Sequence, residues 1–137
     1  MQPDILSFGQ GVLASQPFSA WLGAQLTAFS PGLATIELAN RPEFAQQFGL
    51  VHGGVLSYLA DNALTFAGGS VLGASVLTAE YKINYVRAAR GDRLIARATV
   101  IASSTRQAVC RCDVFSSTDG AETLCATAQG TIVKTGE

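Results

Sequence analysis

The sequence has little of what several kinds of protein chemistry require. Its 137 residues include one histidine, three cysteines and no Cys-x-x-Cys pair, and only 14% of them are charged. This is no recognisable set of zinc ligands, so we expect no metal ion and no bound cofactor. The formal net charge of −1 supplies no positive field for a polyanion, so we expect no nucleic-acid partner.

Long apolar runs are missing as well. No run reaches the roughly 20 apolar residues of a membrane helix. Residues 1 to 11 lack the basic and then apolar segments of a signal peptide. We therefore expect no membrane partner, no signal peptide and a cytoplasmic location. In that reducing compartment, Cys110, Cys112 and Cys125 are best explained as small buried thiols.

The length suits one domain over residues 1–137. Apolar residues make up 48% of the chain, and so few charges leave part of the surface without polar cover. Such a surface is typical of proteins that self-associate. We expect a homodimer, or a homotetramer built as a dimer of dimers.

One long helix is expected from residue 53 to about residue 72. A short helix over 4–15, a strand near 22–29, a turn at 30–32, a strand over 33–39 and a loop over 40–51 precede it. The long helix has a broad apolar stripe at helical spacing, made by Leu56, Leu59, Ala60, Ala63, Leu64, Phe66 and Ala67.

Strands are expected over 78–86, 93–103, 107–116 and 122–134, with a turn at 87–92. In the last three, one alternating face is small and apolar, which lets a helix approach the sheet closely. That face comprises Leu94, Ala96, Ala98, Val100, Ala108, Cys110, Cys112, Val114, Leu124, Ala126, Ala128, Gly130 and Ile132. The order of elements predicts an α+β fold in which one long helix lies across a curved antiparallel sheet of about six strands.

The start of the long helix is a candidate site for chemistry. His52 precedes Gly53 and Gly54, which have no side chain to block an approaching carbonyl. The first N–H groups of a helix have no internal partner and carry partial positive charge, so they suit a developing oxyanion. The alternative is that the two glycines only allow a tight turn into the helix.

Asp61 is the second candidate. It is the only acidic residue between Glu43 and Glu80, and it lies beside the apolar stripe of the helix. If this face of the helix packs against another element, the carboxylate is poorly solvated and could act as a base. Thr65, one turn further on, could then help to hold a water for attack on a carbonyl. The alternative is an ordinary solvated aspartate.

The spacing of these residues bears on the oligomer. Gly53 and Asp61 lie eight residues apart, about 12 Å along one helix, whereas a nucleophile and its oxyanion donors must both lie about 3 Å from one reacting group. Two antiparallel copies of the helix could bring Gly53 of one chain beside Asp61 of the other. This chemistry therefore predicts a dimer with two shared sites.

Other nucleophiles have less support. His52 either helps to polarise the carbonyl or is purely structural. Ser57 has no Gly-x-Ser-x-Gly context and no second histidine, and the cysteines have no activating partner.

Motifs along nearly the whole chain resemble the hotdog-fold acyl-CoA thioesterases, in particular their PaaI-like (phenylacetyl-CoA) branch. They are Pro17-Phe18 with Leu22-Gly23, the strand from Pro31 to Leu38, Gly49-x-x-His52-Gly53-Gly54 with Leu59-Ala60-Asp61, Tyr85-x-Arg87-x-x-x-Gly91-Asp92, and Ala128-Gln129-Gly130-Thr131. The hotdog fold, a sheet wrapped round one long helix, agrees with the element order above.

This resemblance implies roles for single residues. The Gly53 N–H would polarise the thioester carbonyl, Asp61 of the partner subunit would be nucleophile or base, and Thr65 would help to hold the water. Gln46 stands where the family often has asparagine, and in this it is similar to the hydroxybenzoyl-CoA branch, which has glutamine at the matching place. Thr78 matches a serine or threonine position that touches the reacting end in some members.

The substrate would be an acyl-CoA, with Gly54 and Tyr58 also in contact with it. Candidates for binding the coenzyme A phosphates are Arg87, Arg90, Lys82, Arg106, Ser104 and Thr105, with Arg90 preferred. Candidates for the acyl pocket are Phe18, Trp21, Phe48, Leu50, Tyr58 and Phe66.

The predicted function is hydrolysis of an aromatic or short- to medium-chain acyl-CoA to the free acid and coenzyme A. Two alternatives stay open: a non-catalytic acyl-CoA binding module, and a hotdog dehydratase or hydratase. The first has no need of a nucleophile, and the second needs an acid/base motif that we do not find.

Overall fold

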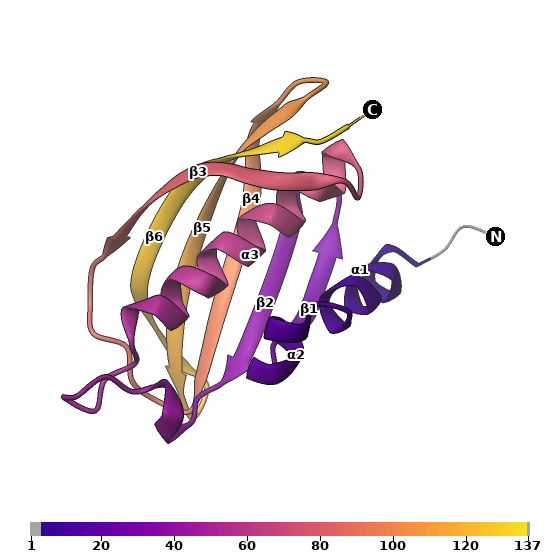
Figure 1. The fold of residues 1–137 in the computed structure, drawn as a ribbon. Coiled ribbons are helices and arrows are strands. Elements are labelled where there is room, and N and C mark those ends of the chain that lie inside the picture. The colour runs from indigo at the N-terminus through magenta and orange to yellow at the C-terminus, as the bar shows by residue number, and fades with distance from the viewer. Residues whose placement is uncertain (1–3, 137) are drawn as a thin grey trace.

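The computed structural model describes residues 4–136 (Figure 1). Two short helices, α1 (Ile5–Ala14) and α2 (Pro17–Leu22), precede strands β1 (Gln25–Ser30) and β2 (Leu33–Ala39). A 3-10 turn, η1 (Pro42–Phe44), leads to the long helix α3 (Gly53–Leu72). The chain ends with strands β3 (Val76–Tyr85), β4 (Arg93–Ser103), β5 (Gln107–Thr118) and β6 (Ala121–Lys134).

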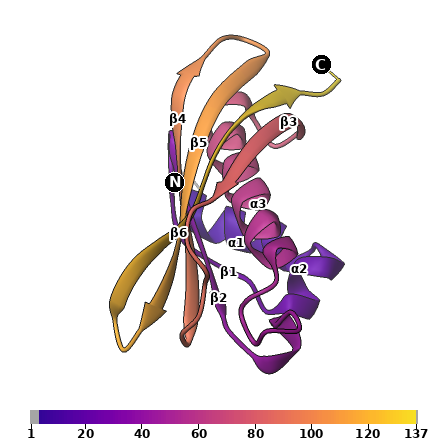
Figure 2. The same ribbon diagram turned by 90° about the vertical axis from the view of Figure 1, so that its left-hand side faces the viewer.

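The strands form one six-stranded sheet in the order β1-β2-β4-β5-β6-β3, with every neighbouring pair antiparallel. The sheet curves around α3, and all three α-helices lie on its concave side (Figure 2). The predicted α+β architecture is therefore confirmed, and β1 and β3 are the two edge strands.

Small side chains let α3 approach the sheet. Leu59, Ala60, Ala63, Leu64 and Ala67 of the predicted stripe are fully buried, and they face the buried alanines and cysteines of β4, β5 and β6. The contact is close at Gly68, where an added Cβ would lie only 2.6 Å from the Cβ of Ile132 on β6.

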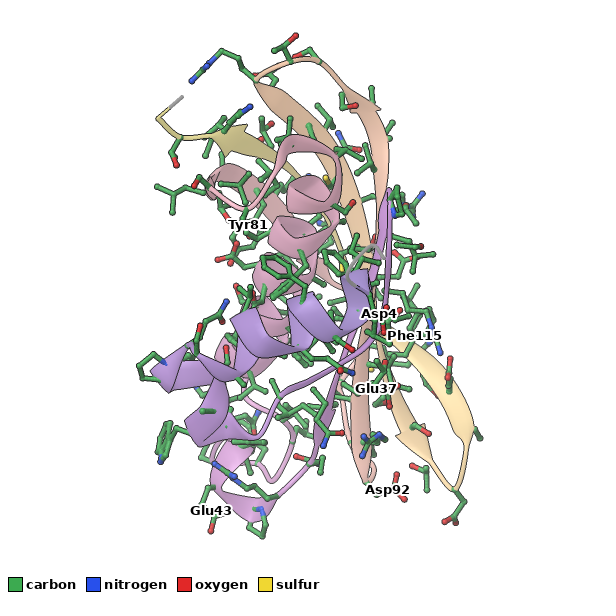
Figure 3. All side chains as sticks on the ribbon, turned by 90° about the vertical axis from the view of Figure 1, so that its right-hand side faces the viewer. Asp4, Glu37, Glu43, Tyr81, Asp92 and Phe115 are labelled. Carbon is green, nitrogen blue, oxygen red and sulfur yellow. The ribbon has the colours of Figure 1, made fainter. Side chains whose placement is uncertain are left out.

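The other face of the sheet is mostly polar. Arg93 pairs with Glu37 at 2.7 Å, and Arg97 makes a bidentate pair with Glu122 at 2.7 and 2.8 Å. Figure 3 shows Glu37 and Phe115 on this outer face and Tyr81 on the side of α3. The alternation of β2, β4 and β5 is thus as predicted.

The predicted strand over 22–29 begins too early. Pro17 occupies the first turn of α2, a position proline favours. Gly23 ends that helix at φ 85°, a left-handed conformation suited to glycine. The strand therefore starts only at Gln25. At the other end of α3, β3 starts at Val76, two residues before the prediction.

The predicted inner face of β6 is wrong at Leu124. The β5–β6 register shifts so that Val114 opposes Ala126 while Phe115 opposes Leu124. This bulge turns Cys125 inward, where it is fully buried, and leaves Leu124 only half-buried.

The cysteines are buried, as predicted. All three are free thiols in the interior, and burial raises the pKa of Cys110 to about 11. Burial, together with the nearby Asp113 carboxylate, raises the pKa of Cys112 to about 12. Both thiols therefore stay protonated near neutral pH and are poor nucleophiles. Within residues 4–136, no helix is long and apolar enough to span a membrane.

Candidate functional site

The start of α3 is tied to two loops. The His52 N–H donates to the Phe44 carbonyl at 2.7 Å, and the Val51 N–H donates to Ala89 at 3.0 Å. The His52 ring caps the helix, because its Nδ1 accepts the Gly54 N–H at 2.8 Å. The Gly54 N–H is therefore already occupied by His52, whereas no acceptor within residues 4–136 takes the Gly53 N–H.

Gly53 itself lies against an aromatic ring. The Tyr85 hydroxyl donates to the Gly53 carbonyl at 3.3 Å, and a Cβ added at Gly53 would meet the Tyr85 ring at 3.5 Å, an ordinary contact. The helix start can thus accept a small side chain, which would crowd the space beside the Gly53 N–H.

Asp61 is half-buried and held from one side. The Thr78 hydroxyl on β3 donates to its Oδ1 at 2.6 Å. Thr65 donates to the backbone carbonyl of Asp61 at 2.8 Å and lies 2.8 Å from the Thr78 hydroxyl. Thr78 is thus the residue that hydrogen-bonds to the carboxylate, and Thr65 contacts Thr78 and the Asp61 backbone instead. Among the described residues, no donor contacts Oδ2 of Asp61.

An open hollow of about 240 Å³ gives access to this carboxylate. We call it the Asp61 pocket, and its lining is Gln16, Phe18, Ser19, Tyr58, Asp61, Asn62, Thr65, Leu77 and Thr78.

A polar cluster in the wall of this pocket joins the predicted Tyr58 to three residues that are absent from the sequence-based candidates, Gln16, Ser19 and Asn62. The Asn62 amide donates to the Tyr58 hydroxyl at 3.0 Å, Tyr58 donates to Ser19 at 2.6 Å, and Ser19 donates to Gln16 at 2.6 Å. The only local signal was the spacing of Tyr58 and Asn62, one helical turn apart. The cluster joins α2 to α3 next to Asp61.

Gln46 shapes the loop before His52. Its Oε1 accepts from the N–H groups of Phe48 at 2.7 Å and Leu50 at 3.2 Å. The side-chain oxygen thus closes this loop, and within residues 4–136 the side-chain nitrogen of Gln46 has no hydrogen-bond partner.

The predicted acyl-pocket residues are divided between different hollows. Phe18, Trp21 and Tyr58 line a hollow of about 700 Å³ beside His52, where Phe18 packs edge-on against Tyr58 with ring centroids 5.4 Å apart. Phe66 lines a separate hollow under α1. Phe48 and Leu50 line neither of them, and Phe48 is 76% exposed.

The predicted phosphate-binding residues also separate. Arg87 and Arg90 lie on the loop after β3, which is bonded to the start of α3 through Ala89 and Val51. Ser104, Thr105 and Arg106 lie on the β4–β5 hairpin, at the opposite end of the sheet (Figure 1). Lys82 lies between these ends, exposed on β3.

One protomer keeps the two candidate groups apart. Gly53 begins α3 and Asp61 lies two turns further, about 12 Å along the same axis. A single carbonyl cannot contact both.

Comparison with known proteins agrees with this fold. The profile of the Thioesterase superfamily matches residues 48–123, more than half of the chain. An Archaeoglobus fulgidus protein named "Putative esterase" is 31% identical over 117 residues, covering 85% of this chain and 73% of that protein.

Solved structures share the fold. A thioesterase family protein from Silicibacter pomeroyi has a TM-score of 0.86 at 31% identity, covering 90% of this chain and 92% of that one. A thioesterase from Haemophilus influenzae has a TM-score of 0.82 and covers 96% and 91%, but at 24% identity this likeness shows the fold alone. The chain belongs to the Thioesterase superfamily, and it is a thioester hydrolase built on the hotdog fold.

Proposed function

We propose that the protein hydrolyses acyl-CoA thioesters, at two sites that are each shared between the subunits of a homodimer. The observation that carries this proposal is the Asp61 carboxylate, anchored by Thr78 at 2.6 Å at the wall of an open pocket. Within the family, we propose on the sequence motifs that the chain belongs to the PaaI-like branch.

Hydrolysis needs a hydrogen-bond donor for the carbonyl oxygen and a carboxylate that acts as base or nucleophile. The unpaired Gly53 N–H at the positive end of α3 would stabilise the oxyanion that forms on the thioester carbonyl. Asp61 would either take a proton from an attacking water or attack the carbonyl carbon itself, forming an anhydride that water then cleaves. In both routes the C–S bond breaks, and coenzyme A leaves as a thiolate that takes up a proton.

Two features support a dimer. One subunit separates Gly53 from Asp61 by two helical turns, so a second α3 has to supply the missing group. The edge strand β3 also exposes apolar side chains, with Leu77 63% and Tyr85 53% exposed. An uncovered apolar edge strand is a template for pairing with another copy. A dimer of dimers is compatible with the same geometry.

Coenzyme A would approach from the loop after β3. Arg87 and Arg90 are exposed cations beside the start of α3, and guanidinium groups suit phosphates. The hairpin residues Ser104 and Arg106 would contribute only from another subunit.

Release of free thiol from a panel of acyl-CoAs tests this proposal, with Asp61→Asn beside the native protein. The amide keeps the shape but has no basic oxygen, so turnover should fall by at least about a hundredfold. Asp119→Asn is the matched control. Asp119 lies in the exposed β5–β6 turn at φ 50°, which asparagine tolerates. Full activity in Asp61→Asn would rule out the proposed role of Asp61.

A further inference from the structure

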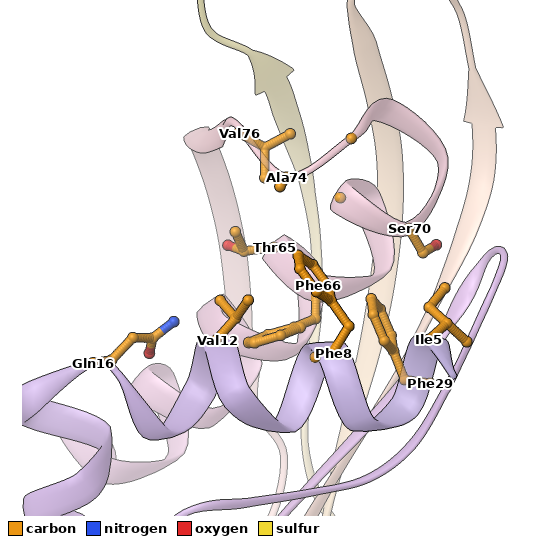
Figure 4. A pocket seen from close by; sticks show the side chains of 13 residues that line it. Ile5, Phe8, Val12, Gln16, Phe29, Thr65, Phe66, Ser70, Ala74 and Val76 are labelled. Atoms are coloured by element: carbon orange, nitrogen blue, oxygen red, sulfur yellow. The ribbon is translucent and has the colours of Figure 1, made fainter. Parts of the chain in front are cut away.

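A second hollow lies next to the Asp61 pocket, beneath α1 (Figure 4). We call it the α1 pocket, and its volume is about 280 Å³. One wall is α1, whose Phe8 and Val12 point toward α3, and Phe66 and Gly69 of α3 form part of the facing wall. Apolar groups dominate the lining.

The two hollows adjoin each other. Thr65 and Gln16 line both of them, and Thr65 is hydrogen-bonded to the Asp61 carbonyl. Asp61, Thr65 and Gly69 follow one another at intervals of one helical turn, so the path from the carboxylate to the far end covers about 12 Å along α3. A thioester whose carbonyl lies at Asp61 can therefore extend its acyl group under α1.

We propose that the α1 pocket binds the acyl group, and that Gly69, Phe8 and Val12 determine its size. This inference rests on the proposed acyl-CoA hydrolysis. A cavity of about 150 Å³ holds benzene, and in proportion 280 Å³ holds at most roughly eleven carbon atoms. The pocket thus suits an apolar acyl group such as octanoyl or phenylacetyl, and palmitoyl is too large.

The walls fit such a group. Phe8 is 56% and Val12 36% exposed, so both offer apolar surface that an acyl group would cover. Deeper in the pocket, Phe29 and Phe66 stand edge to face with centroids 5.6 Å apart, an arrangement that presents apolar surface to either an alkyl chain or a ring.

Gly69 leaves the far end open. Among the described residues, a Cβ added there would meet only Val76, at 3.3 Å. A long side chain at this position would occupy the space of the last carbons of the acyl group, whereas an acetyl group would not reach it.

The test compares substrates within each variant. Gly69→Leu should lower the ratio of kcat/KM for octanoyl-CoA to that for acetyl-CoA by at least about tenfold, because pocket contacts discriminate on that scale. Phe8→Ala should raise the ratio for dodecanoyl-CoA to octanoyl-CoA. The phenylacetyl-CoA ratio shows whether a ring or an alkyl chain is preferred. Gly11→Leu is the control, since Gly11 lies exposed on α1 outside the pocket with nothing within 4 Å.

A binding measurement separates this inference from the proposed function. With Asp61→Asn as background, Gly69→Leu should weaken octanoyl-CoA binding relative to coenzyme A in calorimetry, even if the native protein hydrolyses no acyl-CoA. If Gly69→Leu does not fold, Val12→Trp fills the pocket from α1 with the same expected result. The inference would be overturned if the variants left both the kcat/KM ratios and the binding ratios unchanged, including the case in which a variant alters only the oligomeric state.

Discussion

The two oxygens of the Asp61 carboxylate are in different situations. Oδ1 accepts the short hydrogen bond from Thr78, whereas Oδ2 has no donor within residues 4–136. Hydrogen bonds to a charged acceptor are among the stronger ones. Thr78 therefore orients the carboxylate through one oxygen, and in the proposed mechanism the other oxygen contacts water or substrate.

Thr78→Val should expose this dependence, because valine keeps the shape but loses the donor. A hydrogen bond to a charged group is worth about 1.5–3 kcal/mol, so kcat/KM should fall about tenfold to a hundredfold. Thr78→Ser should restore most of the activity. Thr99→Val on the outer face of β4 is the control, and equal kinetics in both valine variants would show that Thr78 does not position Asp61.

The sequence identified some residues of the candidate site and missed others. The block from His52 to Asp61 is local and recognisable, so its members could be named. Gln16 and Ser19 meet Asn62 across 46 and 43 positions in the chain. No periodicity encodes such contacts, and these residues were missed. The use of His52 as a cap for Gly54 depends on a ring rotamer, which the sequence leaves open.

The elements were predictable where periodicity was long. Helix α3 begins and ends at the expected residues 53 and 72, because five turns of stripe outweigh the weak propensity of its glycines. The six residues of α2 are too few for a periodic signal, and the β6 bulge shifts the alternation by one residue. The short helix α2 and the β6 bulge are therefore the causes of the wrong start of β1 and the wrong face of Leu124.

The approach of α3 to β6 depends on Gly68. In a helix interior alanine is normally more stable than glycine by about 1 kcal/mol. At Gly68, however, the new methyl would lie 2.6 Å from the Ile132 Cβ, and overpacking costs about 1–3 kcal/mol. Gly68→Ala should therefore lower the free energy of unfolding in urea titrations, whereas Gly11→Ala, with no neighbour within 4 Å, should raise it. Stabilisation by both would mean that α3 and β6 lie further apart.

For the whole molecule, the proposed mechanism requires two subunits, because one α3 keeps Gly53 and Asp61 two helical turns apart. The helix begins with the Gly53 N–H, which no described residue accepts, and carries the Asp61 carboxylate two turns on. It lies on the concave face of a sheet in which β3 is an edge strand (Figure 2). If two helices run antiparallel, each site takes Gly53 from one chain and Asp61 from the other. The subunits would then share both sites.

Mixed dimers test this sharing. Neither Asp61→Ala nor Gly53→Val should be active alone: the first lacks the base, and the second crowds the oxyanion donor while its Cβ fits at 3.5 Å from Tyr85. In a mixed dimer both lesions fall in one site and the other site is intact. Random exchange makes half of the dimers mixed, each with one of two sites whole, so about one quarter of native activity should return. A chain carrying both substitutions, mixed with native chain, has one lesion in each site of every mixed dimer, so only the native homodimers should be active. Mixed dimers verified by mass spectrometry that recover nothing would mean that each site lies within one subunit.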